Sequence, residues 1–115
     1  MQLALELDQF RRLVCSLADG AVLATATASN VPEAGRDLRN AIDRAGSTGT
    51  GECWWQEQGG VYWWMFRREA DHLIVAVLWS HGTITGWEHV FRAECDLEWL
   101  AARVREELAR VGGFE

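Results

Sequence analysis

The amino-acid sequence predicts an α+β fold in which one antiparallel sheet packs against three helices in two layers. Residues 53–95 alternate between apolar and polar side chains or run continuously apolar, and short glycine-containing turns interrupt them, as in a strand meander. The segments on either side repeat apolar residues at helical spacing. We expect residues 1–115 to form a single domain, because chains of this length build one hydrophobic core.

The N-terminal half is predicted to be a strand followed by two helices. Residues 2–7 alternate as a half-buried strand does, and this strand either joins the meander as a fifth strand or stays apart from it. Asp8 is expected to cap a helix with Phe10, Leu13, Val14 and Leu17 on its apolar side. That helix ends at Asp19-Gly20 or continues to about Thr27.

A second helix is predicted from Asn30-Val31-Pro32 to Gly46, because proline suits the first turn of a helix. The run 46–52 is rich in glycine, serine and threonine, which predicts a flexible connector to the meander. A phosphate-binding loop would need a lysine and a helix after the glycines, whereas Glu52 and a strand-like segment follow.

The meander is predicted to contain four strands, at residues 53–57, 61–69, 72–80 and 83–95, with a bulge at Gly86. A first turn centred on Gly59 would place Trp54 opposite Trp64 and Trp55 opposite Trp63. A second turn at Ala70-Asp71 would place Tyr62 opposite Trp79. Asp96 then caps a C-terminal helix that Gly112-Gly113 ends.

Both faces of this sheet are predicted to carry large aromatic side chains, although antiparallel sheets usually keep one face polar. Either the helices divide between the faces, or they cover one face and leave the other for a partner. In the second interpretation the partner-binding face has aromatic residues at its centre and arginines at its rim, as binding hot spots do. Its predicted residues are Trp54, Tyr62, Trp64, Phe66, Trp79, Arg68 and Arg92.

The covered face is predicted to hold a possible small-ligand or enzymatic pocket lined by Trp55, Trp63, Trp87 and His89. His89 is more simply a core histidine bonded to a backbone carbonyl. No motif supplies a nucleophile, an oxyanion hole or a cofactor site, so we expect no enzymatic activity and no cofactor. The cysteines Cys15, Cys53 and Cys95 lack zinc-ligand spacing, which argues against a metal site and for a reducing, cytoplasmic location.

Composition narrows the function classes further. A net charge of -6 disfavours nucleic acid as a partner, and no apolar run is long enough to span a membrane. The first hypothesis is therefore a small protein-interaction domain that forms a homodimer or binds another protein. Because the chain is acidic, we expect such a partner to be basic. One version is an immunity- or antitoxin-like protein that binds a basic toxin, which it resembles in size, acidity and aromatic content. The second hypothesis is the pocket around His89, and the third is a structural subunit of a larger complex.

Overall fold

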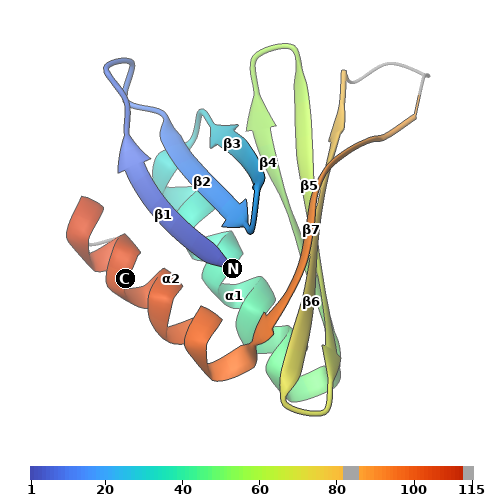
Figure 1. The fold of residues 1–115 in the computed structure, drawn as a ribbon. Helices are drawn as coiled ribbons and strands as arrows, with labels where there is room; N and C mark the ends of the chain where they lie inside the picture. Colours follow the sequence, from blue (N-terminus) through green and yellow to red (C-terminus); the bar gives the residue numbers. More distant parts are fainter. Residues whose placement is uncertain (82–85, 113–115) are drawn as a thin grey trace.

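The computed structural model describes residues 1–81 and 86–112, and Figure 1 shows their arrangement. Within these residues the chain forms two antiparallel sheets and two helices. We call β1-β2-β3 the N-terminal sheet and β4-β5-β6-β7 the C-terminal sheet. The elements in chain order are β1 (Gln2–Leu7), β2 (Leu13–Asp19), β3 (Val22–Ala28), α1 (Val31–Thr48), β4 (Thr50–Glu57), β5 (Gly60–Glu69), β6 (His72–Ser80), β7 (Glu88–Asp96) and α2 (Leu97–Val111).

The predicted α+β class is correct, but the predicted arrangement of one sheet against three helices is wrong. The segment expected as the first helix is a pair of strands, β2 and β3, and β1 pairs with β2 rather than joining the meander. Asp8 caps a tight turn and not a helix, because its carboxylate accepts hydrogen bonds from the N–H groups of Phe10 and Arg12, each at 2.9 Å. Arg11 has a φ of 62°, which no helix accommodates.

Two signals explain why residues 13–28 form strands. Leu13, Cys15 and Leu17 are buried while the residues between them are more exposed, which is the period of a strand. Asp19 pairs with Val22 across a two-residue turn in which Gly20 has a φ of 62°, a conformation that glycine adopts without strain.

The helix predicted from Asn30 is confirmed as α1, but it extends through Gly46 to Thr48. The Asn30 side chain accepts a hydrogen bond from the N–H of Glu33, so it acts as the N-cap. Gly49, with a φ of 98°, ends the helix and β4 begins at the next residue. Residues 46–52, expected as a flexible connector, therefore belong to the end of α1, its cap and the start of β4.

The meander is confirmed, and so is the predicted pairing of Tyr62 with Trp79. The predicted pairing across the first turn is wrong by one residue. Glu57 pairs with Gly60 across the two-residue turn Gln58-Gly59, so Trp54 lies opposite Trp63 instead of Trp64. Because neighbouring residues of a strand point to opposite faces, this change moves every side chain of β5 to the other face relative to β4.

The last strand also differs from its prediction. It runs from Glu88 to Asp96, and an irregularity in the ladder lies opposite Val77 and Leu78 rather than at Gly86. As a result Ala76 pairs with Arg92, whereas a two-residue turn between the strands predicted at 72–80 and 83–95 would have paired it with Trp87. Thr83, where this strand was expected to begin, lies outside the described residues.

Helix α2 follows Asp96 as predicted, and its N-cap carboxylate accepts from the N–H of Glu98 at 2.8 Å. The helix also binds the free edge of β1 through three side chains spaced along one side. Arg103 donates to the carbonyl of Leu3, and the Leu5 N–H donates to Glu107, each at 2.9 Å. Arg110 donates to the carbonyl of Leu5. These side chains satisfy backbone groups that a neighbouring strand would otherwise bind.

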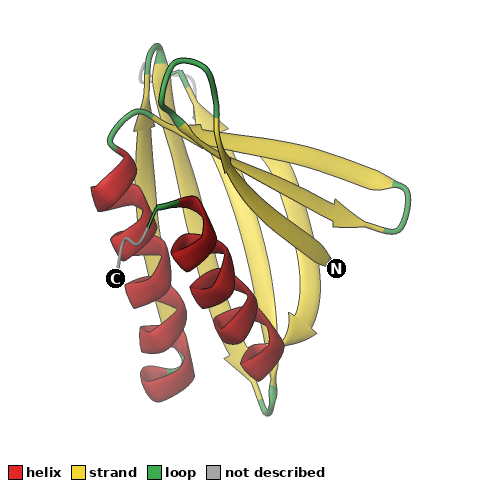
Figure 2. Cartoon of the chain, turned by 90° about the vertical axis from the view of Figure 1, so that its left-hand side faces the viewer, coloured by secondary structure: helices red, strands yellow, loops and turns green. Residues whose placement is uncertain are grey.

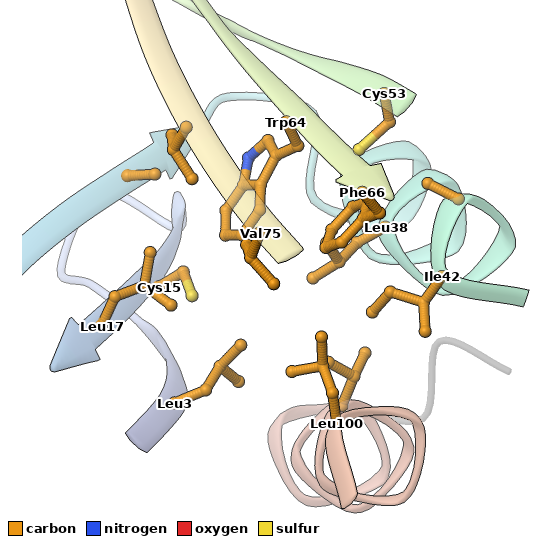
Figure 3. Packing of buried hydrophobic residues seen from close by; sticks show 14 of the residues in the cluster. Leu3, Cys15, Leu17, Leu38, Ile42, Cys53, Trp64, Phe66, Val75 and Leu100 are labelled. Carbon is orange, nitrogen blue, oxygen red and sulfur yellow. The ribbon is translucent and has the colours of Figure 1, made fainter. Parts of the chain in front are cut away.

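Both helices lie on the same side of the C-terminal sheet, together with the N-terminal sheet (Figures 1 and 2). The core fills the space between them, and Figure 3 shows Trp64, Phe66 and Val75 facing the helices and the N-terminal sheet. The buried side chains of the other elements in this core include Leu3, Cys15 and Leu17 from the N-terminal sheet, Leu38 and Ile42 from α1, and Leu100 from α2.

Because α1 packs closely on β4, we predict that adding a side chain at Gly51 strongly destabilises the fold. A Cβ atom at this residue would lie 2.0 Å from the carbonyl oxygen of Ala41, so the helix and the strand would have to separate. We expect Gly51→Ala to lower the free energy of unfolding by at least about 2 kcal/mol in urea denaturation. Gly46→Ala is the matched control, because its Cβ would meet only Leu97 at 3.5 Å and alanine favours the helix. Equal stability of the two variants would contradict the close packing of α1 on β4.

Candidate functional site

The C-terminal sheet has one face that no described helix or strand covers (Figure 1). We call it the open face. Strand alternation places two rows of side chains at its centre. The first row across the strands is Glu52, Met65, Ala76 and Arg92, and the second is Trp54, Trp63, Leu78 and His89.

Three tryptophans form a cluster on the open face. The Trp54 and Trp63 rings are stacked with centroids 6.0 Å apart, and Trp87 packs against Trp63 at 5.1 Å. Trp54 is 44% exposed and Trp87 is 42% exposed. Most large apolar side chains in a protein of this size are buried, so two half-exposed tryptophans in contact with a third mark a surface of unusual composition.

A cleft of about 600 Å³ lies beside this cluster on the open face. Met65, Ile74 and Ala76 provide its apolar lining, and Arg44, Arg67, Arg92 and Glu52 provide its charges. Arg67 forms an ion pair with Glu69 at 3.0 Å, and Glu52 accepts a hydrogen bond from Nε1 of Trp63 at 3.0 Å. Within residues 1–81 and 86–112, Arg44 and Arg92 have no ion-pair partner.

The residues predicted to form a partner-binding face do not share one surface. Trp54 and Arg92 lie on the open face, whereas Trp64 and Phe66 are buried in the core. The rings of Tyr62 and Trp79 pack against each other in a tilted arrangement, with centroids 4.5 Å apart, on the same inner side as Trp64. Arg68 is exposed and donates to the carbonyls of Ala70 and Gly46.

The residues predicted to line a pocket are separated as well. Trp55 is fully buried and donates from Nε1 to the carbonyl of Ala34 at 3.1 Å, whereas Trp63 and Trp87 lie on the open face. His89 is exposed on that face opposite Leu78, so it is not the core histidine that the sequence suggested. Trp55 and Trp63 point to opposite faces of the sheet, so the four side chains do not line one pocket.

The predicted register put Trp63 opposite Trp55 on the covered face, whereas the structure places Trp63, together with Met65 and Leu78, on the open face. The signal that could have placed them is the dipeptide Gln58-Gly59. A two-residue turn with glycine at its second position is a common hairpin connection, and Gly59 has a φ of 87°.

The titratable groups away from the open face are explained by structure. Burial raises the pKa of the Cys15 and Cys53 thiols, and it raises that of Cys95 to about 11, so none is a reactive thiolate at neutral pH. Burial opposes ionisation of Glu57, but its pKa is lowered overall because Thr27 and Ser29 donate to the carboxylate. Glu57 thereby connects the end of β3 to β4.

Other observations on the described residues are negative. They contain no cluster of three or more side chains of the metal-ligating types. Neither α1 nor α2 has the length and apolarity needed to cross a bilayer. Comparison with family models, with curated proteins and with solved structures finds no match to this chain.

Proposed function

We propose that this protein is an interaction domain that forms a homodimer through its open face. The observation that carries the proposal is the composition of that face, which presents Trp54 and Trp87 at 44% and 42% exposure beside Met65 and Leu78. Tryptophan and methionine are enriched at the centres of protein interfaces. Covering these side chains with a second apolar surface removes them from water, which stabilises the complex.

The charges of the open face support a second copy of the chain as the occupant. Four carboxylates lie on or beside this face, those of Glu52, Glu69, Glu94 and Asp96, and the three guanidinium groups of Arg44, Arg67 and Arg92 nearly balance them. The whole chain carries a net charge of -6, so most of its excess acidic charge lies elsewhere. Two copies that meet through this face bring few uncompensated like charges together, so the repulsion between them is small. The acidic remainder faces outward on the dimer, where it favours a basic protein as a further partner.

The proposal is tested by a substitution that introduces one charged side chain at the centre of the open face. Ala76 is partly buried in the middle of that face beside Arg92, so Ala76→Glu replaces an apolar contact by a carboxylate from each copy, which pairs with Arg92 of its own chain at the expense of contacts between the copies. We expect the dissociation constant of the dimer to rise at least tenfold, to be measured by sedimentation equilibrium. Ser16→Glu is the matched control, because Ser16 is exposed at the middle of the central strand of the N-terminal sheet.

Circular dichroism should show that both variants keep the fold of the wild-type chain. A wild-type chain that stays monomeric at every concentration would overturn the proposal. So would a dimer that Ala76→Glu and Ser16→Glu affect equally, because the interface would then lie on another surface.

A further inference from the structure

We infer how the two copies of the chain are oriented in the dimer, and this inference rests on the proposed homodimer. The two-fold axis runs parallel to the strands of the C-terminal sheet, between β5 and β6. Arg92 of each copy then forms an ion pair with Glu52 of the partner subunit. The inference follows from the order of side chains across the open face.

The row through the centre of the open face begins and ends with opposite charges. Glu52 pairs with Met65, Met65 with Ala76, and Ala76 with Arg92, so these side chains cross the sheet from β4 to β7. Glu52 and Arg92 are three strand spacings apart, or about 14 Å. They cannot form an ion pair with each other within one chain, and Arg92 has no other ion-pair partner among residues 1–81 and 86–112.

A two-fold axis parallel to the strands reverses the order of the strands while keeping each row at its own level. It places β4 over β7 of the partner subunit and β5 over its β6. The guanidinium of Arg92 then meets the carboxylate of Glu52, twice in each dimer, and Met65 meets Ala76 near the axis. In the second row, Trp63 meets Leu78, so apolar side chains face apolar side chains.

A two-fold axis that runs across the strands, midway between the two rows, does not match charges in this way. It would place β4 over β4 and exchange the two rows, so Glu52 would face Trp54 and Arg92 would face His89. Both charged groups would leave water without an opposite charge, which is strongly unfavourable. Both axes keep the strands of the two sheets within the roughly 30° that face-to-face packing allows, so the charge pattern is what distinguishes them.

A charge exchange tests the orientation. Glu52→Arg and Arg92→Glu each place like charges across the interface, so we expect each variant alone to dissociate at least tenfold more readily than the wild type. A mixture of the two variants should associate, because opposite charges then meet in both contacts. In one contact the introduced guanidinium at position 52 faces the introduced carboxylate at position 92, and in the other the unchanged Arg92 faces the unchanged Glu52. The double variant Glu52→Arg/Arg92→Glu should also recover a dimer, although it lacks the hydrogen bond from Trp63 to Glu52.

Glu106→Arg and Arg105→Glu serve as controls, because they make the same charge changes on the exposed side of α2. The measurement is sedimentation equilibrium of each variant, of the mixture and of the double variant at equal total concentration. Association of the wild type together with no recovery in the mixture or the double variant would overturn the orientation and leave the homodimer standing. A monomeric wild type would instead overturn the homodimer on which the orientation rests.

Discussion

Replacing Trp64 by alanine is expected to lower the free energy of unfolding by about 3–5 kcal/mol. Trp64 is fully buried, and its ring contacts those of Trp55 and Phe66 at centroid distances of 4.9 and 6.1 Å. Removing the indole leaves a cavity between the two sheets that the rigid surrounding elements cannot fill. The effect is to be measured by urea denaturation.

Trp54→Ala is the comparison that makes this measurement informative. Trp54 has the same residue type and lies in the adjacent strand of the same sheet, but it points to the open face and is 44% exposed. In the monomer we expect its replacement to lower stability by less than about 1 kcal/mol. Both variants are best studied in the Ala76→Glu background, so that association does not contribute to stability. Similar losses at the two positions would show that the faces are assigned incorrectly.

The second large effect is expected at Glu107. Its side chain is 6% exposed and accepts from Arg110 and from the Leu5 N–H, so it connects α2 to the free edge of β1. Glu107→Gln removes the negative charge that Arg103 and Arg110 face at 3.9 and 3.1 Å. We expect it to lower the free energy of unfolding at pH 7 by about 1.5–3 kcal/mol, to be measured by urea denaturation.

The same residue predicts the sign of a pH dependence. Hydrogen bonds from Arg110, together with the bond from the Leu5 N–H, hold the pKa of Glu107 below its ordinary value despite burial. Its carboxylate therefore stabilises the fold fully above the unfolded pKa of about 4.3, and this contribution is lost as the pH falls through the lower folded pKa. The stability difference between wild type and Glu107→Gln should shrink between pH 7 and pH 2. A difference that is unchanged over this range would contradict the role given to the ionised carboxylate.

Three elements of the fold could be predicted from the sequence because their signals are local. Asn30 and Asp96 are side-chain caps followed by apolar residues at helical spacing, and both helices begin where these caps predict. The strands on either side of Ala70-Asp71 also pair in the predicted register. Each of these predictions depends on interactions between residues close together in the chain.

Residues 8–28 fit two interpretations, and the helical one is wrong. Phe10, Leu13, Val14 and Leu17 fit a helical stripe, while Leu13, Cys15 and Leu17 fit a strand equally well. The hairpin signal Asp19-Gly20 favoured strands. What decides the outcome is tertiary packing, because the buried side of β2 completes the core against the C-terminal sheet and α2 (Figure 3).

The candidate site depended on register, which is why it was only partly predicted. The sequence left open whether the helices divide between the two faces of the meander or leave one uncovered, and the structure has an uncovered face. A change of one residue in the length of the first turn decides whether Trp63 or Trp64 lies beside Trp54 on the open face. On β7 the observed register, with its ladder irregularity opposite Val77 and Leu78, places Arg92, and not Trp87, beside Ala76.

The most direct test of the homodimer is the mass of the wild-type chain in solution, measured by light scattering during size exclusion over a tenfold range of concentration. The account predicts a mass that approaches about 26 kDa at the upper end, twice the 13.0 kDa of one chain. A mass that stays at 13.0 kDa throughout would contradict it, because the open face would then remain in contact with water.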